Sequence, residues 1–218
     1  MDRVRQGGKQ RNLSSREELF NSITHGVGVM LSIVALVVLI VHAVTKGNAW
    51  HVVSFSIFGS TLILMYLSSA LYHGSVSQRW KNVFIRFDHS VIFLLIAGTY
   101  TPYLLTVVKW WLWWVLFGII RLLAIIGVVI RSIAPMRFVQ SMLIVYLMMG
   151  WMFIIAIVPM IKNMPSISFI LLLVWGVLYS IGTIFYNRRL MRFSHGIRHL
   201  FVLAGSTAHF FSILYTLR

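Results

Sequence analysis

Seven apolar runs of about 20 residues follow one another along this chain, and that is the length that crosses a hydrocarbon layer as an α-helix. Of the 218 residues, 59% are apolar and only 11% are charged, whereas about a quarter of a soluble globular domain is charged. The composition therefore excludes a water-soluble protein and predicts an all-α membrane protein, a bundle of seven transmembrane helices within residues 17–218. We place the helices at residues 21–44, 50–73, 84–106, 110–130, 138–158, 167–186 and 194–217.

Basic residues between the apolar runs predict how the bundle is inserted. Residues 1–16 are polar and basic, too poor in apolar residues to fold alone, and we expect them to form a flexible tail. Outside the apolar runs, and counting Arg86 at the edge of the third run, thirteen Lys and Arg fall on the side of this tail and four on the opposite side. Cytoplasmic loops are enriched in Lys and Arg. We therefore expect the N-terminus in the cytoplasm and, after seven crossings, the C-terminus outside.

Charge and cysteine content exclude several kinds of partner and site. The formal net charge of +15 would suggest nucleic acid as the partner of a soluble protein. Here the basic residues sit mainly between membrane spans, where they set orientation, so we expect membrane lipids and no nucleic acid as partners. The chain has no cysteine, which rules out disulfides, thiolate metal sites and cysteine nucleophiles. Any metal must be bound by histidine, carboxylate or hydroxyl groups.

Four ionisable side chains converge at one membrane depth. The chain has only four acidic residues, and none follows Asp88, which lies near the expected cytoplasmic start of the third helix. His73 closes the second helix on that same side, and His195 and His199 open the seventh. Ionisable groups inside a membrane are functional candidates by default.

Helical spacing brings these groups onto common faces. Residues four apart lie on one helix face about 5–6 Å apart, so His195 and His199 can point at one ion, and Ser69 lies one turn before His73. The first helix carries its own polar or small face, which should turn to the bundle interior. His25 on that face is near the depth of the other groups and could line the entrance to their site. The face consists of Glu18, Asn21, His25, Gly28 and Ser32.

Three neutral imidazoles with one open position are the ligand set of a catalytic zinc site. We hypothesise Zn²⁺ bound by His73, His195 and His199, with Asp88 as general base for the water that the metal activates and Ser69 positioning it. Other interpretations stay open. The two histidines of the seventh helix can hydrogen-bond across helices, Asp88 can face the positive end of its own helix, and the Ser69 hydroxyl can bond a carbonyl of its own helix.

At these residues the sequence resembles the bacterial hemolysin III family, which is related to the progestin and adiponectin receptors and, more distantly, to the alkaline ceramidases. The matching segments are residues 18–25 (ELFNSITH), 68–73 (SSALYH), 88–102 (DHSVIFLLIAGTYTP) and 195–209 (HGIRHLFVLAGSTAH). The resemblance implies a seven-helix bundle with a cytoplasmic N-terminus and a zinc site on the cytoplasmic side. The implied ligands map onto His73, His195 and His199, with Ser69 and Asp88 nearby.

The chain departs from the family pattern at Arg198, where the resemblance implies an apolar or aromatic residue. Arg198 lies about 100° around the helix from His199, so metal ligation should survive this departure. Its guanidinium could instead contact the head group of an anionic lipid or substrate.

These features favour an integral-membrane hydrolase that uses zinc-activated water on a lipid amide or ester drawn from the inner leaflet. Two other functions stay open. One is a non-enzymatic regulator or sensor of membrane lipid state in which zinc is structural. The other is the pore-forming cytolysin that the family's name suggests. It has less support, because a conducting path needs a polar lining across the bilayer and the polar residues gather at one end.

Overall fold

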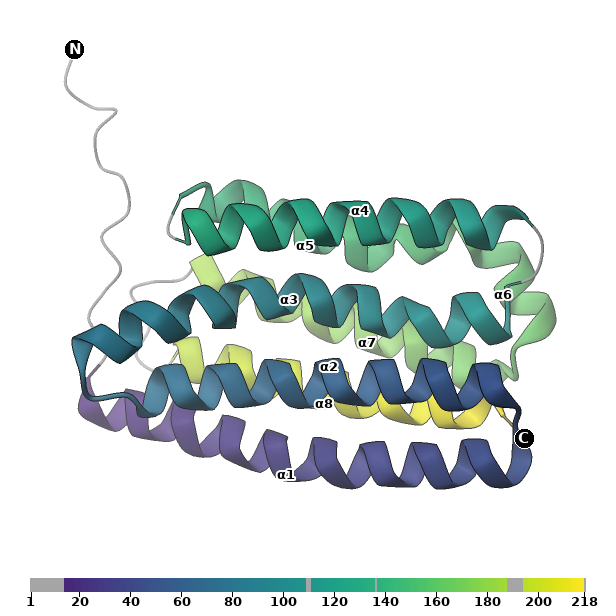
Figure 1. The fold of residues 1–218 in the computed structure, drawn as a ribbon, viewed down its shortest axis with the longest axis horizontal. Helices are drawn as coiled ribbons and strands as arrows, with labels where there is room; N and C mark the ends of the chain where they lie inside the picture. Colours follow the sequence, from purple (N-terminus) through teal and green to yellow (C-terminus); the bar gives the residue numbers. More distant parts are fainter. Residues whose placement is uncertain (1–13, 109–110, 136, 188–193, 218) are drawn as a thin grey trace, which may run out of the picture.

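Every regular element of the described residues is helical, and the long helices run along the long axis of the bundle (Figure 1). The computed structural model describes residues 14–108, 111–135, 137–187 and 194–217. Its helices are α1 (Ser15–Lys46), α2 (Ala49–Gly74), α3 (Gln78–Thr106), α4 (Trp111–Ile133), α5 (Val139–Trp151), η1, a 3₁₀ helix (Met152–Ala156), α6 (Ile157–Asn163), α7 (Ser166–Asn187) and α8 (Ser194–Thr216). Since α5, η1 and α6 make one span, seven segments are long and apolar enough to cross a membrane. This confirms the predicted seven-helix bundle.

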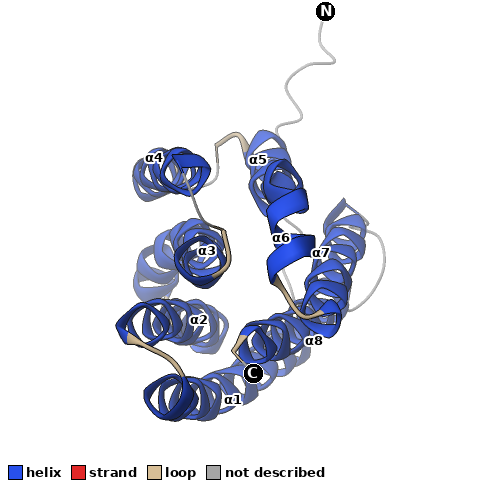
Figure 2. Cartoon of the chain, turned by 90° about the vertical axis from the view of Figure 1, so that its right-hand side faces the viewer, coloured by secondary structure: helices blue, strands red, loops and turns tan. Residues whose placement is uncertain are grey.

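The helices pack in two rows, which Figure 2 shows end-on. Helices α1 to α4 lie side by side in sequence order, and α5 to α8 form the second row. Helix α8 packs against α7 and also against α1, so the first and last helices are neighbours. Residues of α1, α2 and α8 that are far apart in sequence therefore share one part of the bundle interior.

The two ends of the bundle differ in the residues that they carry. At the end that we call the histidine end, His73 lies in the last turn of α2 and His195 in the first turn of α8. At the opposite end, the tryptophan end, Trp50 and Trp111 lie in the first turns of α2 and α4. The assignment of the histidine end to the cytoplasm stays a prediction from the distribution of basic residues.

The first helix begins earlier than its apolar run because a capping box starts it. The Ser14 hydroxyl accepts the Glu17 N–H at 3.3 Å, and the Glu17 carboxylate accepts the Ser14 N–H at 2.9 Å. This reciprocal pair satisfies backbone donors that a helix start leaves unpaired. Of the tail predicted for residues 1–16, residues 1–13 lie outside the described part of the chain, and α1 takes up the rest from Ser15.

Large apolar side chains cover the outside of the bundle. Met30, Val34 and Val41 of α1, and Leu122 and Ile125 of α4, are each more than half exposed. A continuous apolar exterior of this kind marks a surface made to contact something other than water. On helices of transmembrane length the partner is the hydrocarbon of the bilayer, so the chain is a multi-pass membrane protein.

The fifth span is interrupted because a tyrosine hydroxyl enters its hydrogen-bond ladder. The Tyr100 hydroxyl of α3 donates to the Met149 carbonyl at 2.6 Å and accepts the Phe153 N–H at 3.0 Å. In a continuous α-helix that N–H would bond the Met149 carbonyl directly. Pro159 adds to the break, since it has no N–H to offer the carbonyl four residues earlier. The sequence places the fifth helix at 138–158, whereas the structure extends the span to Asn163 and divides it into α5, η1 and α6.

Replacing Tyr100 with Phe should lower the stability of the bundle by about 1–2 kcal/mol, because the hydroxyl makes buried hydrogen bonds. Thermal unfolding of the purified protein in detergent, followed by circular dichroism, measures the effect. A Tyr100→Phe protein as stable as wild type would contradict the role given to the hydroxyl.

Candidate metal centre

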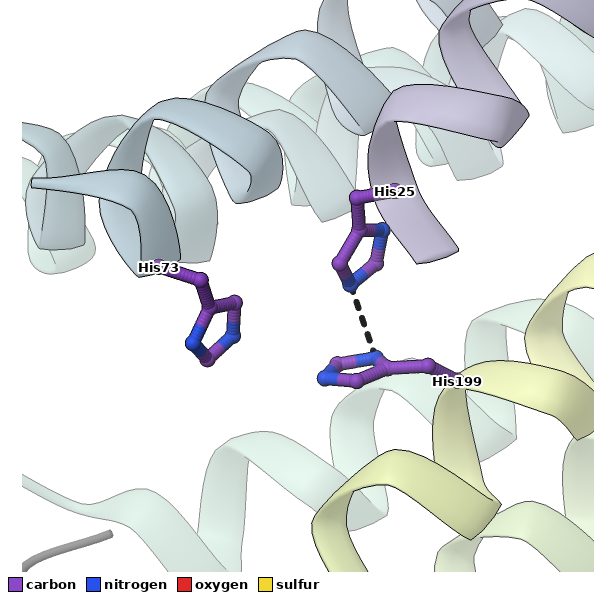
Figure 3. Close-up of side chains that lie close together, drawn as sticks. All are labelled: His25, His73 and His199. Atoms are coloured by element: carbon purple, nitrogen blue, oxygen red, sulfur yellow. Dashed lines mark hydrogen bonds between the residues drawn. The ribbon is translucent and has the colours of Figure 1, made fainter. Parts of the chain in front are cut away.

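Four histidine side chains meet inside the histidine end of the bundle. His25 comes from α1, His73 from α2, and His195 and His199 from the first two turns of α8; Figure 3 shows His25, His73 and His199. The ring centroids of His195 and His199 are 4.4 Å apart, and those of His73 and His195 are 5.0 Å apart. The three histidines predicted as ligands therefore lie together, and His25 joins them.

The ring nitrogens are close enough to share one ion. One nitrogen each from His25, His73 and His199 lies within 4.8 Å of the other two. In addition, Nε2 of His195 is 3.2 Å from Nε2 of His73. Two nitrogens bound at about 2.0–2.1 Å to one tetrahedral zinc would be about 3.3 Å apart. The 3.2 Å separation of the His73 and His195 nitrogens fits two zinc ligands, and it equally fits a hydrogen bond between the two rings, the alternative that the sequence left open.

Unpaired nitrogens at the cluster also fit a metal. Nε2 of His199 and Nδ1 of His25 are buried and have no hydrogen-bond partner within the described part of the chain. A buried polar group left unpaired costs about 1–3 kcal/mol, and a neutral imidazole has one nitrogen lone pair that a metal can take. The donor set, all imidazole nitrogen, suits zinc and other divalent transition metals.

Glu18 fixes the orientation of His73. Its Oε2 lies 2.7 Å from Nδ1 of His73, and its other oxygen pairs with the Lys81 ammonium. A carboxylate that accepts the Nδ1–H leaves Nε2 as the lone-pair nitrogen, an arrangement that recurs around metal-binding histidines. The sequence does not reveal Lys81 as a partner, because the third helix was expected from residue 84. In the structure α3 begins at Gln78, so Lys81 lies on this helix, and its ammonium pairs with the Glu18 carboxylate.

His25 orients His199 in a similar way. Nε2 of His25 and Nδ1 of His199 lie 2.9 Å apart, the contact dashed in Figure 3. When Nδ1–H of His199 donates to Nε2 of His25, Nε2 of His199 keeps its lone pair for a further ligand, and Nδ1 of His25 carries a proton. His25 was expected at the entrance of the site. The structure instead buries it within the cluster, at 2% exposed.

A serine–carboxylate pair lies one helical turn from the cluster. The Ser69 hydroxyl donates to Oδ1 of Asp88, joining α2 to α3, rather than to a carbonyl of its own helix. Asp88 is half-buried, whereas Ser69 is buried. Because Ser69 precedes His73 by four residues on α2, the pair presents a carboxylate on the same face of that helix as a candidate ligand.

Asn21 and Arg198, the two remaining candidates, border the cluster. Asn21 is 1% exposed, and neither atom of its carboxamide has a hydrogen-bond partner among the residues that the structure describes. A Nη2 nitrogen of Arg198 lies 3.2 Å from Nε2 and 3.3 Å from Nδ1 of His195. The guanidinium therefore lies against a ring of the cluster. Its expected contact with an anionic head group stays a prediction.

Known proteins resemble the chain over almost its whole length. The sequence pattern of the family described as Haemolysin-III related matches residues 13–210. The protein named Hemolysin-3 homolog of Bacillus subtilis (strain 168) is 47% identical over 200 residues, which cover 92% of this chain and 94% of that protein. The protein named Hemolysin-3 of Bacillus cereus is 44% identical over 200 residues, covering 92% of this chain and 91% of that protein. These matches confirm the resemblance found in the sequence.

Replacing Glu18 with Gln should weaken zinc binding about 10–100-fold, because the His73 ring loses the carboxylate that orients it. Competition with a chromophoric chelator measures the affinity of the detergent-solubilised protein. Glu17→Gln is the matched control, since a capping box accepts Gln in place of Glu, and its affinity should equal that of wild type. Equal zinc affinities for both variants would rule out the positioning role of Glu18.

Proposed function

The chain belongs to the Haemolysin-III-related family, and we propose that it is a zinc-dependent hydrolase of a membrane lipid amide or ester. One observation carries the proposal: a cluster of buried imidazoles with unpaired nitrogens lies beside a serine-bound carboxylate. Metal ligands next to a candidate general base are the components that hydrolysis by a metal site requires.

We assign His73, His195 and His199 as the metal ligands and His25 as a supporting residue. The 3.2 Å separation of the His73 and His195 nitrogens supports the first two. The unpaired Nε2 of His199, whose Nδ1 is held by His25, supports the third. His25 then orients His199 by a hydrogen bond, as Glu18 orients His73. The alternative set of His25, His73 and His199 makes a different prediction, which is tested below.

Zinc held by three imidazoles supplies a Lewis acid that polarises a carbonyl and lowers the pKa of water. The chain's own residues would transfer the protons and hold the proton-transferring carboxylate in position. The Asp88 carboxylate accepts a proton from the attacking water and returns it to the leaving group, as a general base and then a general acid. The Ser69 hydroxyl, bonded to Oδ1 of Asp88, orients the carboxylate so that its second oxygen is available for this transfer.

The lipid substrate would reach the cluster from the surrounding leaflet. The bundle is apolar on its outside, and the cluster lies within the turns next to the histidine end. An acyl chain can stay in the hydrocarbon while the amide or ester group enters at the depth of the histidines. With the predicted orientation, this leaflet is the cytoplasmic one.

A regulator or sensor with structural zinc is the second candidate. The same metal would join α1, α2 and α8, whose residues His25, His73 and His199 meet at the cluster, and cross-linking helices is what a structural site does. In that case metal removal lowers stability and leaves lipid turnover unchanged. A cytolytic pore, which the names of the relatives suggest, has no comparable support from the cluster.

Zinc content distinguishes the two ligand sets. His195→Ala should reduce bound zinc from about one per chain to near zero, because removing one of three ligands destroys the site. His25→Ala should keep most of its zinc and bind it about 10–100-fold more weakly, as expected for loss of a supporting residue. Elemental analysis of purified protein measures both, with His51→Ala as the matched control. Loss of zinc only in His25→Ala would favour the alternative set.

Hydrolysis tests the assignment of Asp88. Asp88→Asn should keep bound zinc and lower the rate of lipid cleavage by about 10²–10⁴-fold, since the amide cannot accept the proton. Release of fatty acid from vesicles that contain a ceramide, as the lipid amide, or a diacylglycerol, as the lipid ester, gives the rate by mass spectrometry. Activity that persists in metal-free wild-type protein, or in Asp88→Asn at the wild-type rate, would reject the mechanism.

A further inference from the structure

A buried carboxamide beside the histidine cluster has no partner. Asn21 of α1 is 1% exposed, and its Oδ1 and Nδ2 make no hydrogen bond to any residue that the structure describes. The interior of a membrane protein offers little water to such a group, and leaving it unpaired is costly. A side chain kept in this state is a candidate for binding a molecule that enters the bundle.

Asn21 lies between two residues of α1 that contact the assigned metal ligands. Glu18, three residues earlier, has its Oε2 2.7 Å from Nδ1 of His73. His25, four residues later, has its Nε2 2.9 Å from Nδ1 of His199, the contact dashed in Figure 3. Residues three and four apart share one helix face. The buried carboxamide therefore faces the interior where α1 meets α2 and α8.

The first turn of α8 packs against this carboxamide. A Cβ placed on Gly196 would lie 3.2 Å from Oδ1 of Asn21 and 2.6 Å from the Phe20 ring, so glycine permits this close approach of α1. Gly196 directly follows His195 and lies in the turn that leads to His199. Asn21 thus borders the part of α8 that carries both of its assigned ligands.

The start of α8 determines which end of the carboxamide is left to bind. A helix N-terminus carries a partial positive charge and N–H groups without partners inside the helix. Oδ1 of Asn21 lies against that end of α8, where a carbonyl oxygen is stabilised and an amide N–H is not. Nδ2, with its two hydrogens, is therefore the group available to an incoming acceptor.

We propose that Nδ2 of Asn21 donates a hydrogen bond to the carbonyl oxygen of the scissile lipid group, which makes Asn21 a further catalytic residue. The inference rests on the proposed hydrolysis. When water adds to the carbonyl carbon, an electron pair of the C=O bond moves to that oxygen, and Asp88 takes a proton from the water. The charged oxygen is what a fixed N–H donor stabilises most. The pair then returns to re-form C=O as the bond to the leaving nitrogen or oxygen breaks, and that atom takes the proton from Asp88.

An uncommitted donor suits this task because no existing hydrogen bond has to break before it meets the substrate. The other polar groups on this side of the bundle already have partners: Ser69 bonds Asp88, and Glu18 bonds His73. Asn21 keeps an uncharged N–H donor free of any partner in the described part of the chain. The state that is costly in the resting protein is thus the one that stabilises charge on the substrate.

Asn21→Leu separates this role from a structural one, because leucine has nearly the same shape and no polar atom. The variant should hold zinc as wild type does and unfold at the same or a higher temperature, since no hydrogen bond is lost within the described residues. Its kcat for fatty acid release from phosphatidylcholine vesicles that contain ceramide or diacylglycerol should fall about 10²–10³-fold, with KM little changed. Asn82→Leu, at an exposed asparagine of α3, is the matched control and should match wild type.

Binding of an inhibitor adds a readout that needs no turnover. A long-chain alkyl phosphonate presents a charged oxygen on a tetrahedral centre, and calorimetry should show at least tenfold weaker binding to Asn21→Leu than to wild type or Asn82→Leu. Zinc loss or a lower unfolding temperature in Asn21→Leu would make the residue structural. A wild-type rate or an unchanged phosphonate affinity in that variant would overturn its catalytic role and leave the hydrolase in place. If wild type cleaves neither lipid, the proposed hydrolysis fails and this role fails with it.

Discussion

A bilayer offers no water to the polar groups of a span, and that constraint governs the interior of this protein. Each buried donor or acceptor must find a partner inside the bundle or remain costly. Most find a partner inside the bundle, often on another helix: Tyr100 of α3 bonds the backbone of the fifth span, and Ser69 of α2 bonds Asp88 of α3. The exceptions are therefore informative. Among the described residues, side-chain atoms of Asn21, His25, Trp175, His199 and His209 are buried without a hydrogen-bond partner.

The histidine end combines ligands with the residues that hold them. Glu18 and His25, both on α1, orient His73 of α2 and His199 of α8. Packing of α1 against both helices makes this possible. A polar face on the first helix thus supports a site whose assigned ligands all belong to other helices. Lys81 compensates the remaining charge of Glu18, so the carboxylate can lie in a largely apolar bundle.

The sequence predicts the fold closely, because a run of about 20 apolar residues leaves a chain few alternatives. Helix starts are less accurate: α3 begins at Gln78 rather than 84, since polar residues can continue a helix beyond the hydrocarbon. The break in the fifth span escaped prediction because it depends on Tyr100 of another helix. Depth and spacing brought together His73, His195 and His199, but the contact between His25 and His199 depends on how α1 packs on α8, which periodicity does not specify.

X-ray absorption at the zinc edge of the purified, zinc-replete protein tests the central claim most directly, because it reports the type, number and distance of the ligands around the metal. The account predicts about one zinc per chain with three imidazole nitrogens at about 2.0–2.1 Å and one oxygen ligand, a water, in the fourth position. A protein that retains no zinc after purification, or a spectrum without imidazole scattering, would contradict it.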